Sequence, residues 1–361
     1  MLIRAAVAQI RHSPSKNFLY LCKTLDFDLE SKYELDPMRA LVCHQFGEPS
    51  TLRVEEAPRP AMREGCVRIA VEAAGINFAD MLIVQGRYQV KPPFPFIPGL
   101  EVAGTVTEVA QGVTRFRVGD RVMAIPGLGG LAEEVVCPAD VTYDIDDQVD
   151  WAHAACFPIV YGTAYGSLLW RARLAPDETV LILGAAGGLG SAAIQVARAA
   201  GAKVIAAVGG AEKLRKVESY GAHHAIDYTA SDLKQEIRRL TNGRGVDVVV
   251  DPVGGEMFDL ALRAVGWEGR IISVGFASGQ IPQAPVNLLL VKNITVIGFF
   301  WGEYRQRQPD RVRQAYRDMM SWWRDAKVRP DVTRVFDLAH AATALSLLGE
   351  RRATGKFAVV T

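Results

Sequence analysis

The stretch Val180–Lys216 reads VLILGAAGGLGSAAIQVARAAGAKVIAAVGGAEKLRK, and it decides the fold. An apolar run, a glycine-rich turn, a helical pattern and a second apolar run predict a strand–turn–helix–strand unit. Free N–H groups and the positive end of the dipole make the start of such a helix an anion site. We therefore expect the turn to hold the pyrophosphate of a dinucleotide. The contacting residues would be Ala186, Gly187, Gly188 and Leu189, while Gly190 allows close packing of the helix on the sheet.

The same alternation of strands and helices continues after this unit. Apolar strands are expected at 179–184, 203–208, 225–228, 246–253, 270–275 and 294–300, and helices at 188–200, 211–220, 231–241 and 255–265. Their Val/Ile runs are continuous, which is typical of strands that are buried on both faces. The sequence therefore predicts an α/β fold with a doubly wound parallel sheet.

The flanking regions have a different pattern. Residues 38–160 contain short β-like runs broken by Gly and Pro, which indicates a compact barrel-like β domain. The last sixty residues lack the alternation, so about 305–361 is expected to complete that first domain. Residues 161–304 would then form the dinucleotide-binding domain, and residues 1–37 an extension.

The end of the second strand of this unit bears on which dinucleotide is bound. An Asp or Glu there would bind the ribose 2′-hydroxyl and repel a 2′-phosphate. The chain instead has Val208-Gly209-Gly210, with Lys213 four residues past Gly209 and Tyr228 after the next strand. Charge and hydrogen bonding from these side chains favour NADPH.

Composition limits the partners. Lys+Arg number 41 and Asp+Glu 40, so no global field attracts nucleic acid or an anionic membrane. Five scattered cysteines without a C-x-x-C indicate a reducing compartment, and we expect a cytoplasmic protein. The acid-free, basic segment 1–25 has the composition of an organellar transit peptide. The alternative is a poorly ordered extension before a start at Met38.

Six ordered motifs between Met38 and Thr361 resemble one family. They are AGINFADMLIVQGRY (74–88), PFIPGLEVAG (95–104), FRVGDRV (116–122), GAAGGLG (184–190), GVDVVVDPVGG (245–255) and GRIISVGF (269–276). The chain resembles the zinc-free NADPH:quinone oxidoreductases, the zeta-crystallin-like branch of the medium-chain dehydrogenase/reductase superfamily. The resemblance implies a GroES-like β-barrel catalytic domain, a Rossmann domain and an active site between them.

The resemblance also implies roles for particular residues. Asn77 matches an asparagine beside the nicotinamide and substrate, and Thr163, Gly275 and Phe276 match positions near the nicotinamide. Lys213, Tyr228 and Arg352 match contacts to the 2′-phosphate. The strand at Asn293–Phe300 matches an edge strand that extends the sheet across a homodimer.

Two positions differ from the zinc-dependent branch of the superfamily. That branch has a cysteine where Asn77 stands, and G-H-E where this chain has Gly99-Leu100-Glu101. It also has a four-cysteine lobe that is absent between Arg121 and Glu134. Without thiolate or imidazole at these positions, we expect no catalytic metal. Glu101 alone is more typical of a hydrogen-bonded structural carboxylate.

Chemistry without a metal favours an acceptor that is already electrophilic, such as a quinone. Conjugated enones and enoyl-thioesters such as enoyl-CoA are the alternative, and an NADPH-binding protein with little turnover is a third hypothesis. Asn77 is the candidate to anchor a substrate oxygen or the carboxamide, unless it only caps a turn. Tyr88 is the candidate proton donor, unless it only packs on the prolines of VKPPFPF (90–96).

Overall fold

Six parallel strands form the sheet that the glycine-rich unit predicts. The computed structural model describes residues 37–350 and 353–361, so the predictions for residues 1–36 and for Arg352 lie outside the described residues. The strands are β8 (Thr179–Ile182), β9 (Lys203–Val208), β10 (His224–Asp227), β11 (Val246–Asp251), β12 (Val265–Ser273) and β13 (Thr295–Gly298). Their order is β10-β9-β8-β11-β12-β13, and every neighbouring pair is parallel.

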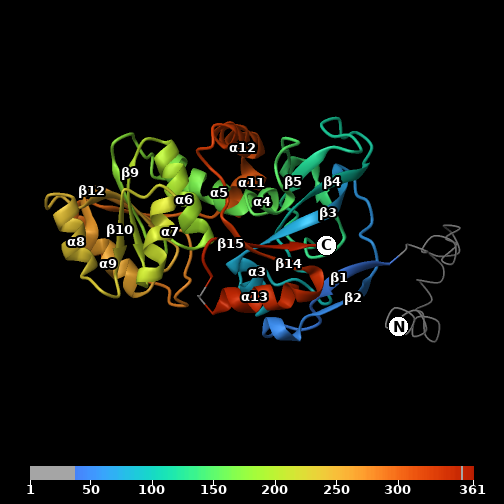
Figure 1. Cartoon of the computed structure of the whole chain (residues 1–361), viewed down its shortest axis with the longest axis horizontal. Helices are drawn as coiled ribbons and strands as arrows, with labels where there is room; N and C mark the ends of the chain where they lie inside the picture. Colours follow the sequence, from blue (N-terminus) through green and yellow to red (C-terminus); the bar gives the residue numbers. More distant parts are fainter. Residues whose placement is uncertain (1–36, 351–352) are drawn as a thin grey trace, which may run out of the picture. The chain divides into compact units, whose positions relative to one another are not determined.

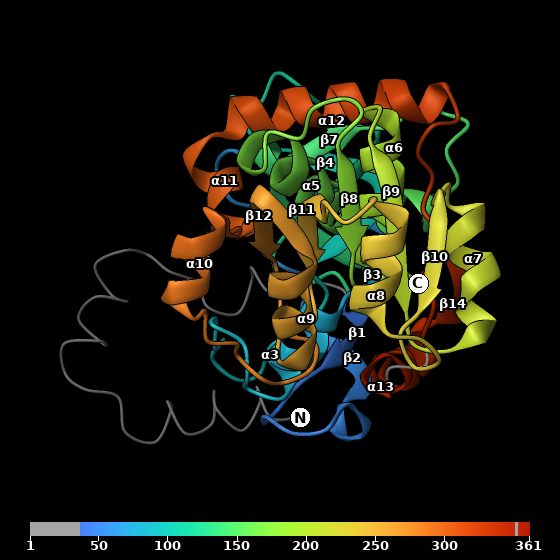
Figure 2. The same cartoon turned by 90° about the vertical axis from the view of Figure 1, so that its left-hand side faces the viewer.

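Both faces of this sheet are buried, as the continuous apolar runs predict. Val180 and Ile182 of β8 pack into one core cluster, and Leu181 of the same strand packs into another. Figure 2 shows helices on both sides of the sheet, with α8 and α9 on the side facing the viewer. Strand order, parallel pairing and two covered faces confirm the doubly wound α/β sheet.

The helices of this region agree with the predicted ones in place, with shorter ends. They are α6 (Gly188–Ala199), η4 (Ala211–Lys213) with α7 (Leu214–Ser219), α8 (Leu233–Leu240) and α9 (Glu256–Ala264). Two helices were not predicted, α10 (Val286–Lys292) and α11 (Trp301–Arg307). Strand β12 also begins five residues earlier than expected, because an irregularity in its pairing with β11 lets Val265 pair with Val246.

The chain also forms a second sheet, which has seven strands (Figure 1). Its strands are β3 (Cys66–Ile76), β4 (Glu101–Val109), β5 (Arg121–Ala124), β6 (Glu134–Pro138), β7 (Thr142–Asp144), β14 (Val332–Asp337) and β15 (Lys356–Val360). Strands β1 (Met38–Val42) and β2 (Arg53–Ala57) form a separate antiparallel pair. The long strand β3 pairs with β4, β6 and β15, so the end of the chain lies beside residues near its start.

Helices complete this part of the chain. They are η1 (Pro49–Thr51), α3 (Phe78–Val84), η2 (Ala139–Val141), α4 (Trp151–Ala155), α5 (Pro158–Tyr165), η3 (Gly166–Arg171), α12 (Pro309–Arg324), η5 (Leu338–His340) and α13 (Ala341–Gly349). Helix α3 starts where β3 ends, and α13 packs against it. Within the described ranges, every helix is too short or too polar to cross a membrane.

Candidate active site

The glycine loop between β8 and α6 has room for a ligand. Gly187 stands at the N-cap of α6 with φ −78° and ψ 173°, and an added Cβ there would meet only Gly184 O, at 3.5 Å. A Cβ at Gly190 would instead lie 2.5 Å from Gly184 O, so the helix packs on the turn only with glycine at that position. The loop is therefore an open cradle at a helix N-terminus, which fits a pyrophosphate.

Two of the three side chains expected at a 2′-phosphate, Lys213 and Tyr228, lie close together around Gly209. The third, Arg352, lies outside the described residues. Lys213 Nζ donates to Gly209 O at 3.0 Å, and an added Cβ at Gly209 would lie 2.8 Å from the Tyr228 hydroxyl. Strands β9 and β10 are parallel neighbours, so the residues that follow them meet at one edge of the sheet. The Lys213 ammonium and the Tyr228 phenol thus lie beside Gly209 at the carboxyl ends of β9 and β10, and we call this place the corner of the sheet.

Two carboxylates at this corner were missed by the sequence reasoning. Asp227, at the end of β10, accepts hydrogen bonds from Gly210 N and from Thr229, and these bonds hold its pKa below the usual value. Glu212 lies beside Lys213, with 3.8 Å between Oε1 and Nζ. Glu212 is separated from the end of β9 by three residues, so it does not occupy the strand-end position at which an acid binds the ribose.

Asn77 lies at the start of α3 with its amide turned into a buried polar cluster. Its Oδ1 accepts from Lys356 Nζ at 2.7 Å, and its Nδ2 donates to Glu101 Oε1 at 2.8 Å. Lys356 Nζ also donates to Glu101 Oε1 at 2.8 Å and to Ile76 O at 2.7 Å. Asn77 is also the N-cap of α3, in a capping box with Asp80, so the same side chain caps the helix and contacts a buried ion pair.

Lys356 was not anticipated, although its sequence context was unusual. It is the single charged residue at the head of the buried strand KFAVV (356–360), and its side chain is 4% exposed. Glu101, expected as a structural carboxylate, is fully buried, and its second oxygen accepts from Ile159 N at 2.7 Å. A charge that opens an apolar strand is the signal that could have identified this pair.

Asp80, the third residue of α3, lies beneath this cluster. Its carboxylate accepts from Asn77 N at 2.8 Å. Complete burial raises the pKa of Asp80 from 3.8 to about 7, against the opposing effects of the Asn77 N–H and of Lys356. Asp80 is therefore a buried carboxyl group with a pKa near neutral, in the part of the chain that contains the seven-stranded sheet.

Asp80 is expected to make folding pH-dependent. Between about pH 4 and 7 the folded chain keeps a proton that the unfolded chain has released, so this group lowers the free energy of unfolding as pH rises through that window. Asp80→Asn keeps an acceptor for Asn77 N–H and cannot ionise. The difference in melting temperature, Asp80→Asn minus wild type, should therefore be larger at pH 8 than at pH 5. Scanning fluorimetry measures this difference. An equal difference at both pH values would contradict this.

Tyr88 and Thr163 lie on separate elements. Tyr88 follows α3 and is half-buried against the core of the β lobe. Burial raises the pKa of its phenol, as does the Asp80 charge, so the group keeps its proton at neutral pH. Thr163 is on α5 and is partly exposed.

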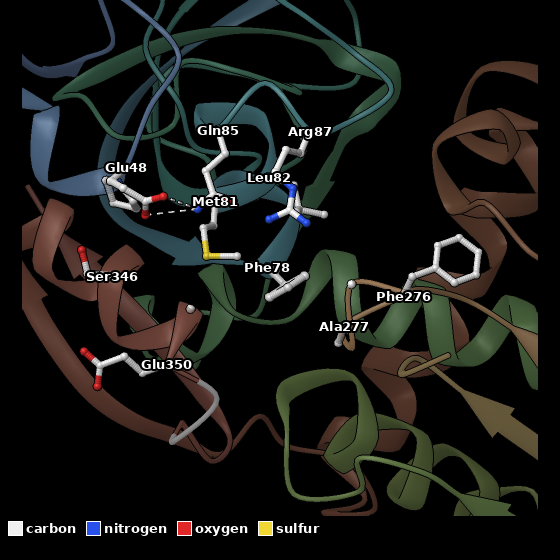
Figure 3. A pocket seen from close by; sticks show the side chains of 13 residues that line it. Glu48, Phe78, Met81, Leu82, Gln85, Arg87, Phe276, Ala277, Ser346 and Glu350 are labelled. Atoms are coloured by element: carbon white, nitrogen blue, oxygen red, sulfur yellow. Dashed lines mark hydrogen bonds between the residues drawn. The ribbon is translucent and has the colours of Figure 1, made fainter. Parts of the chain in front are cut away.

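A pocket of about 390 Å³ opens between α3, α13 and the loop that follows β12 (Figure 3). Its apolar lining includes Phe78, Met81, Leu82, Phe276 and Ala277, and its polar lining includes Glu48, Gln85, Arg87, Ser346 and Glu350. Phe276 and Gly275 come from the carboxyl end of β12, the same edge of the parallel sheet as the glycine loop. The pocket therefore lies beside the edge at which doubly wound sheets bind their ligands.

Among residues 37–350 and 353–361, no group of three or more His, Cys, Asp or Glu side chains is arranged to hold a metal ion. At positions 77 and 101 the structure has an amide and a carboxylate, both bound to the Lys356 ammonium. The polar groups described at this site are thus the Lys356 ammonium, the Glu101 and Asp80 carboxyl groups, the Asn77 amide and the Tyr88 phenol.

Comparison with known proteins agrees with this architecture. A model described as "Alcohol dehydrogenase GroES-like domain" matches residues 63–147, and one described as "Zinc-binding dehydrogenase" matches residues 188–322. The quinone oxidoreductase-like protein 2 homolog of Nematostella vectensis is 40% identical over 326 residues, 90% of this chain and 89% of that protein. Quinone oxidoreductase-like protein 2 of Bos taurus is 39% identical, over 88% of this chain and 91% of that protein.

A solved structure has the same fold. Escherichia coli quinone oxidoreductase, complexed with NADPH, superposes with a TM-score of 0.83 at 28% identity, covering 90% of this chain and 99% of that one. Fold and site together define a two-domain, nicotinamide-dependent oxidoreductase. The chain belongs to the medium-chain dehydrogenase/reductase superfamily, in its quinone oxidoreductase branch.

Proposed function

We propose that this protein transfers a hydride from NADPH to quinones without a metal ion. The observation that carries the proposal is the open glycine cradle of α6 at the same sheet edge as a pocket with both apolar and polar lining residues. The solved relative that carries NADPH and is named a quinone oxidoreductase supports it. Gly187 and Gly188 would hold the pyrophosphate, while Asn77, Thr163, Gly275 and Phe276 would lie around the nicotinamide.

The residues of the pocket would bind and orient the acceptor. When bound, the reduced nicotinamide supplies a hydride, which carries both electrons, and the quinone oxygen takes up a proton. Phe78, Phe276 and Leu82 would pack on a flat apolar ring and exclude water. Tyr88 is not among the described lining residues of the pocket, and its raised pKa makes it a weaker acid. It would therefore donate a hydrogen bond to the oxygen of an acceptor that reaches it.

The charge of the pocket favours a neutral acceptor over an enoyl-thioester. Among the lining residues in the described ranges 37–350 and 353–361, Arg87 is the one cation, and Glu48 and Glu350 supply two carboxylates. A coenzyme A moiety is strongly anionic and would need a basic surface at this opening. A quinone carries no charge and needs none.

Four electron acceptors of different chemical class test this proposal directly. NADPH absorbance is followed with 1,4-benzoquinone, 9,10-phenanthrenequinone, a simple enone and crotonyl-CoA. We expect oxidation with the quinones and at least tenfold slower oxidation with crotonyl-CoA. Faster oxidation with crotonyl-CoA would favour the enoyl reductase, and NADPH binding without any oxidation would favour a binding protein.

Lys213 is expected to set the preference for NADPH. Lys213→Ala removes the ammonium at the corner formed with Gly209 and Tyr228, so NADPH should bind about tenfold more weakly, while NADH affinity changes less than twofold. Fluorescence titration of both cofactors measures the two constants. Glu212→Gln is the matched control, because it removes a neighbouring negative charge and should strengthen NADPH binding. Equal losses for both cofactors in Lys213→Ala would contradict the 2′-phosphate site.

We propose a homodimer through the edge strand β13. This strand ends the six-stranded sheet and, among the described strands, pairs with β12 alone, so its other edge could pair with a second copy. Helix α10, which precedes β13 in the sequence, exposes the apolar side chains of Leu290 (75%) and Val291 (68%). Extension of one sheet into the other would cover both features.

The exposed side chains of α10 provide the test of this interface. Leu290→Glu combined with Val291→Glu should convert the dimer to a monomer at about 10 µM, because two charges would be buried without partners. Light scattering after size exclusion measures the mass. Val118→Glu, at an exposed apolar residue of the other lobe, is the control and should leave the dimer intact. A dimer that survives the double substitution would rule out this surface.

We place the protein in the cytoplasm, since Cys43, Cys66, Cys137 and Cys156 are all free thiols in the buried core. We also propose that residues 38–160 with about 305–361 form the catalytic domain, and residues 161–304 the cofactor domain. Strands β14 and β15 support this division because they join the sheet of β3.

A further inference from the structure

One buried cation outside the expected site residues is in contact with the site. Lys356 Nζ has three oxygen partners within 2.8 Å, Ile76 O, Asn77 Oδ1 and Glu101 Oε1. Both members of the Lys356–Glu101 ion pair are nearly inaccessible, at 4% and 0% side-chain exposure. Burial of such a pair costs desolvation free energy. Apolar residues of similar size at the same two positions often give a fold that is equally stable or more stable. A role other than stability would account for the pair.

The ion pair determines which way the Asn77 amide faces. An ammonium can only donate and a carboxylate can only accept, so Oδ1 must face Lys356 and Nδ2 must face Glu101. A flipped amide would place its NH₂ group against the ammonium and its oxygen against the carboxylate. The Asn77 side chain also takes part in the capping box of α3, where it accepts from the Asp80 backbone N–H. With the orientation fixed, the second Nδ2 hydrogen has one fixed direction.

The stem of the same lysine lies against the cofactor loop. An added Cβ at Gly188 would lie 2.7 Å from Lys356 Cδ, so the glycine packs directly on the stem. The preceding residue also contacts the loop, because Gly355 N donates to Ala186 O at 2.8 Å. One residue thus contacts the glycine loop with its methylenes and Asn77 with its charge.

We propose that Lys356 is a positioning residue that orients the Asn77 amide toward the nicotinamide end of the bound cofactor. The inference rests on the proposed function, in which Asn77 lies beside the nicotinamide. Lys356 itself would touch neither substrate nor the reacting atoms. It would act by holding Asn77 in one orientation relative to the loop that binds the pyrophosphate.

Two neutralising substitutions separate this role from stability. Lys356→Met alone would leave the Glu101 carboxylate buried without a counter-charge and should unfold more easily. Lys356→Met with Glu101→Gln removes both charges and keeps an unbranched stem beneath Gly188. The glutamine amide can accept from Ile159 N and donate to Asn77 Oδ1, which permits the flipped amide. We expect the double variant to recover most of the lost melting temperature.

Binding of the cofactor and of a fragment gives a readout that does not depend on turnover. The fragment 2′,5′-ADP carries the adenosine phosphates without the nicotinamide. In the double variant 2′,5′-ADP should bind within twofold of wild type, while NADPH binds about tenfold more weakly. Turnover number with 1,4-benzoquinone should fall about 30-fold, while KM for the quinone changes less than threefold. Addition of Asn77→Ala to the double variant should cause no further loss in NADPH affinity, because both changes remove the same interaction.

The control is a second ion pair of the same lobe, Arg68 with Glu134, which has no described contact with Asn77 or with the glycine loop. Arg68→Met with Glu134→Gln should leave both ligand affinities unchanged. Equal weakening of NADPH and 2′,5′-ADP in the Lys356 double variant would show a role in loop support alone and would overturn the inference. Recovery of wild-type NADPH affinity together with the melting temperature would also overturn it. If wild type binds neither ligand, the proposed function itself fails.

Discussion

Replacing Gly187 with valine should abolish NADPH binding and leave the fold intact. Within the protein an added Cβ would meet only Gly184 O, at 3.5 Å, and the backbone at φ −78° suits any residue. The valine methyl groups would instead fill the space that the pyrophosphate needs at the start of α6. We expect at least a 100-fold weaker NADPH affinity, by fluorescence titration, with a melting temperature within about 2 °C of wild type.

Gly190→Val is the matched comparison, three residues further on in the same loop-helix unit. Its Cβ would lie 2.5 Å from Gly184 O and 2.6 Å from Ala185 Cα, both backbone atoms that cannot move aside cheaply. This variant should lower the melting temperature strongly, by overpacking the helix on the sheet. If Gly187→Val binds NADPH normally while folded, the ligand does not lie on this loop.

Replacing Asn77 with alanine should lower quinone turnover about 100-fold, which is typical for loss of one well-placed hydrogen-bond donor. The amide is the single described side chain that connects the Lys356–Glu101 pair to the start of α3. Stopped-flow measurement of NADPH oxidation under single-turnover conditions would separate this loss from slow product release.

The fold should tolerate this change. Lys356 retains Ile76 O and Glu101 as partners after the amide is removed, so the buried cation stays compensated. Asn77→Asp offers a second measurement, since it keeps the volume and replaces the donor by a second carboxylate beside Glu101. Unchanged turnover in both variants would remove Asn77 from the reaction and leave it a structural residue.

The parallel sheet could be predicted because its signals are local. Continuous runs such as VLIL (180–183) and VVVD (248–251) reveal strands with two buried faces, and the glycines after β8 locate the ligand edge. The helices α10 and α11 were missed because neither has a clear apolar periodicity. Helix α10 leaves Val286, Leu290 and Val291 exposed, so its sequence resembles a buried strand more than a surface helix.

From the sequence, only those parts of the candidate site could be predicted whose residues lie close together in one segment of the chain. The glycine loop, and the corner of Gly209, Lys213 and Tyr228, follow from neighbouring strands of one unit. The ion pair of Lys356 with Glu101 joins residues 255 positions apart, because β15 and β4 both pair with β3. Such a contact depends on topology that no local pattern contains. Asp80 was missed for a similar reason, because its burial comes from the surrounding lobe.

The most direct test measures NADPH oxidation by 1,4-benzoquinone with protein that has been dialysed against a strong chelator, with metal content determined on the same sample. Hydride transfer at a metal-free site predicts that turnover is retained at less than about 0.1 zinc ion per chain. Loss of turnover on chelation, restored by one equivalent of zinc, would contradict the account.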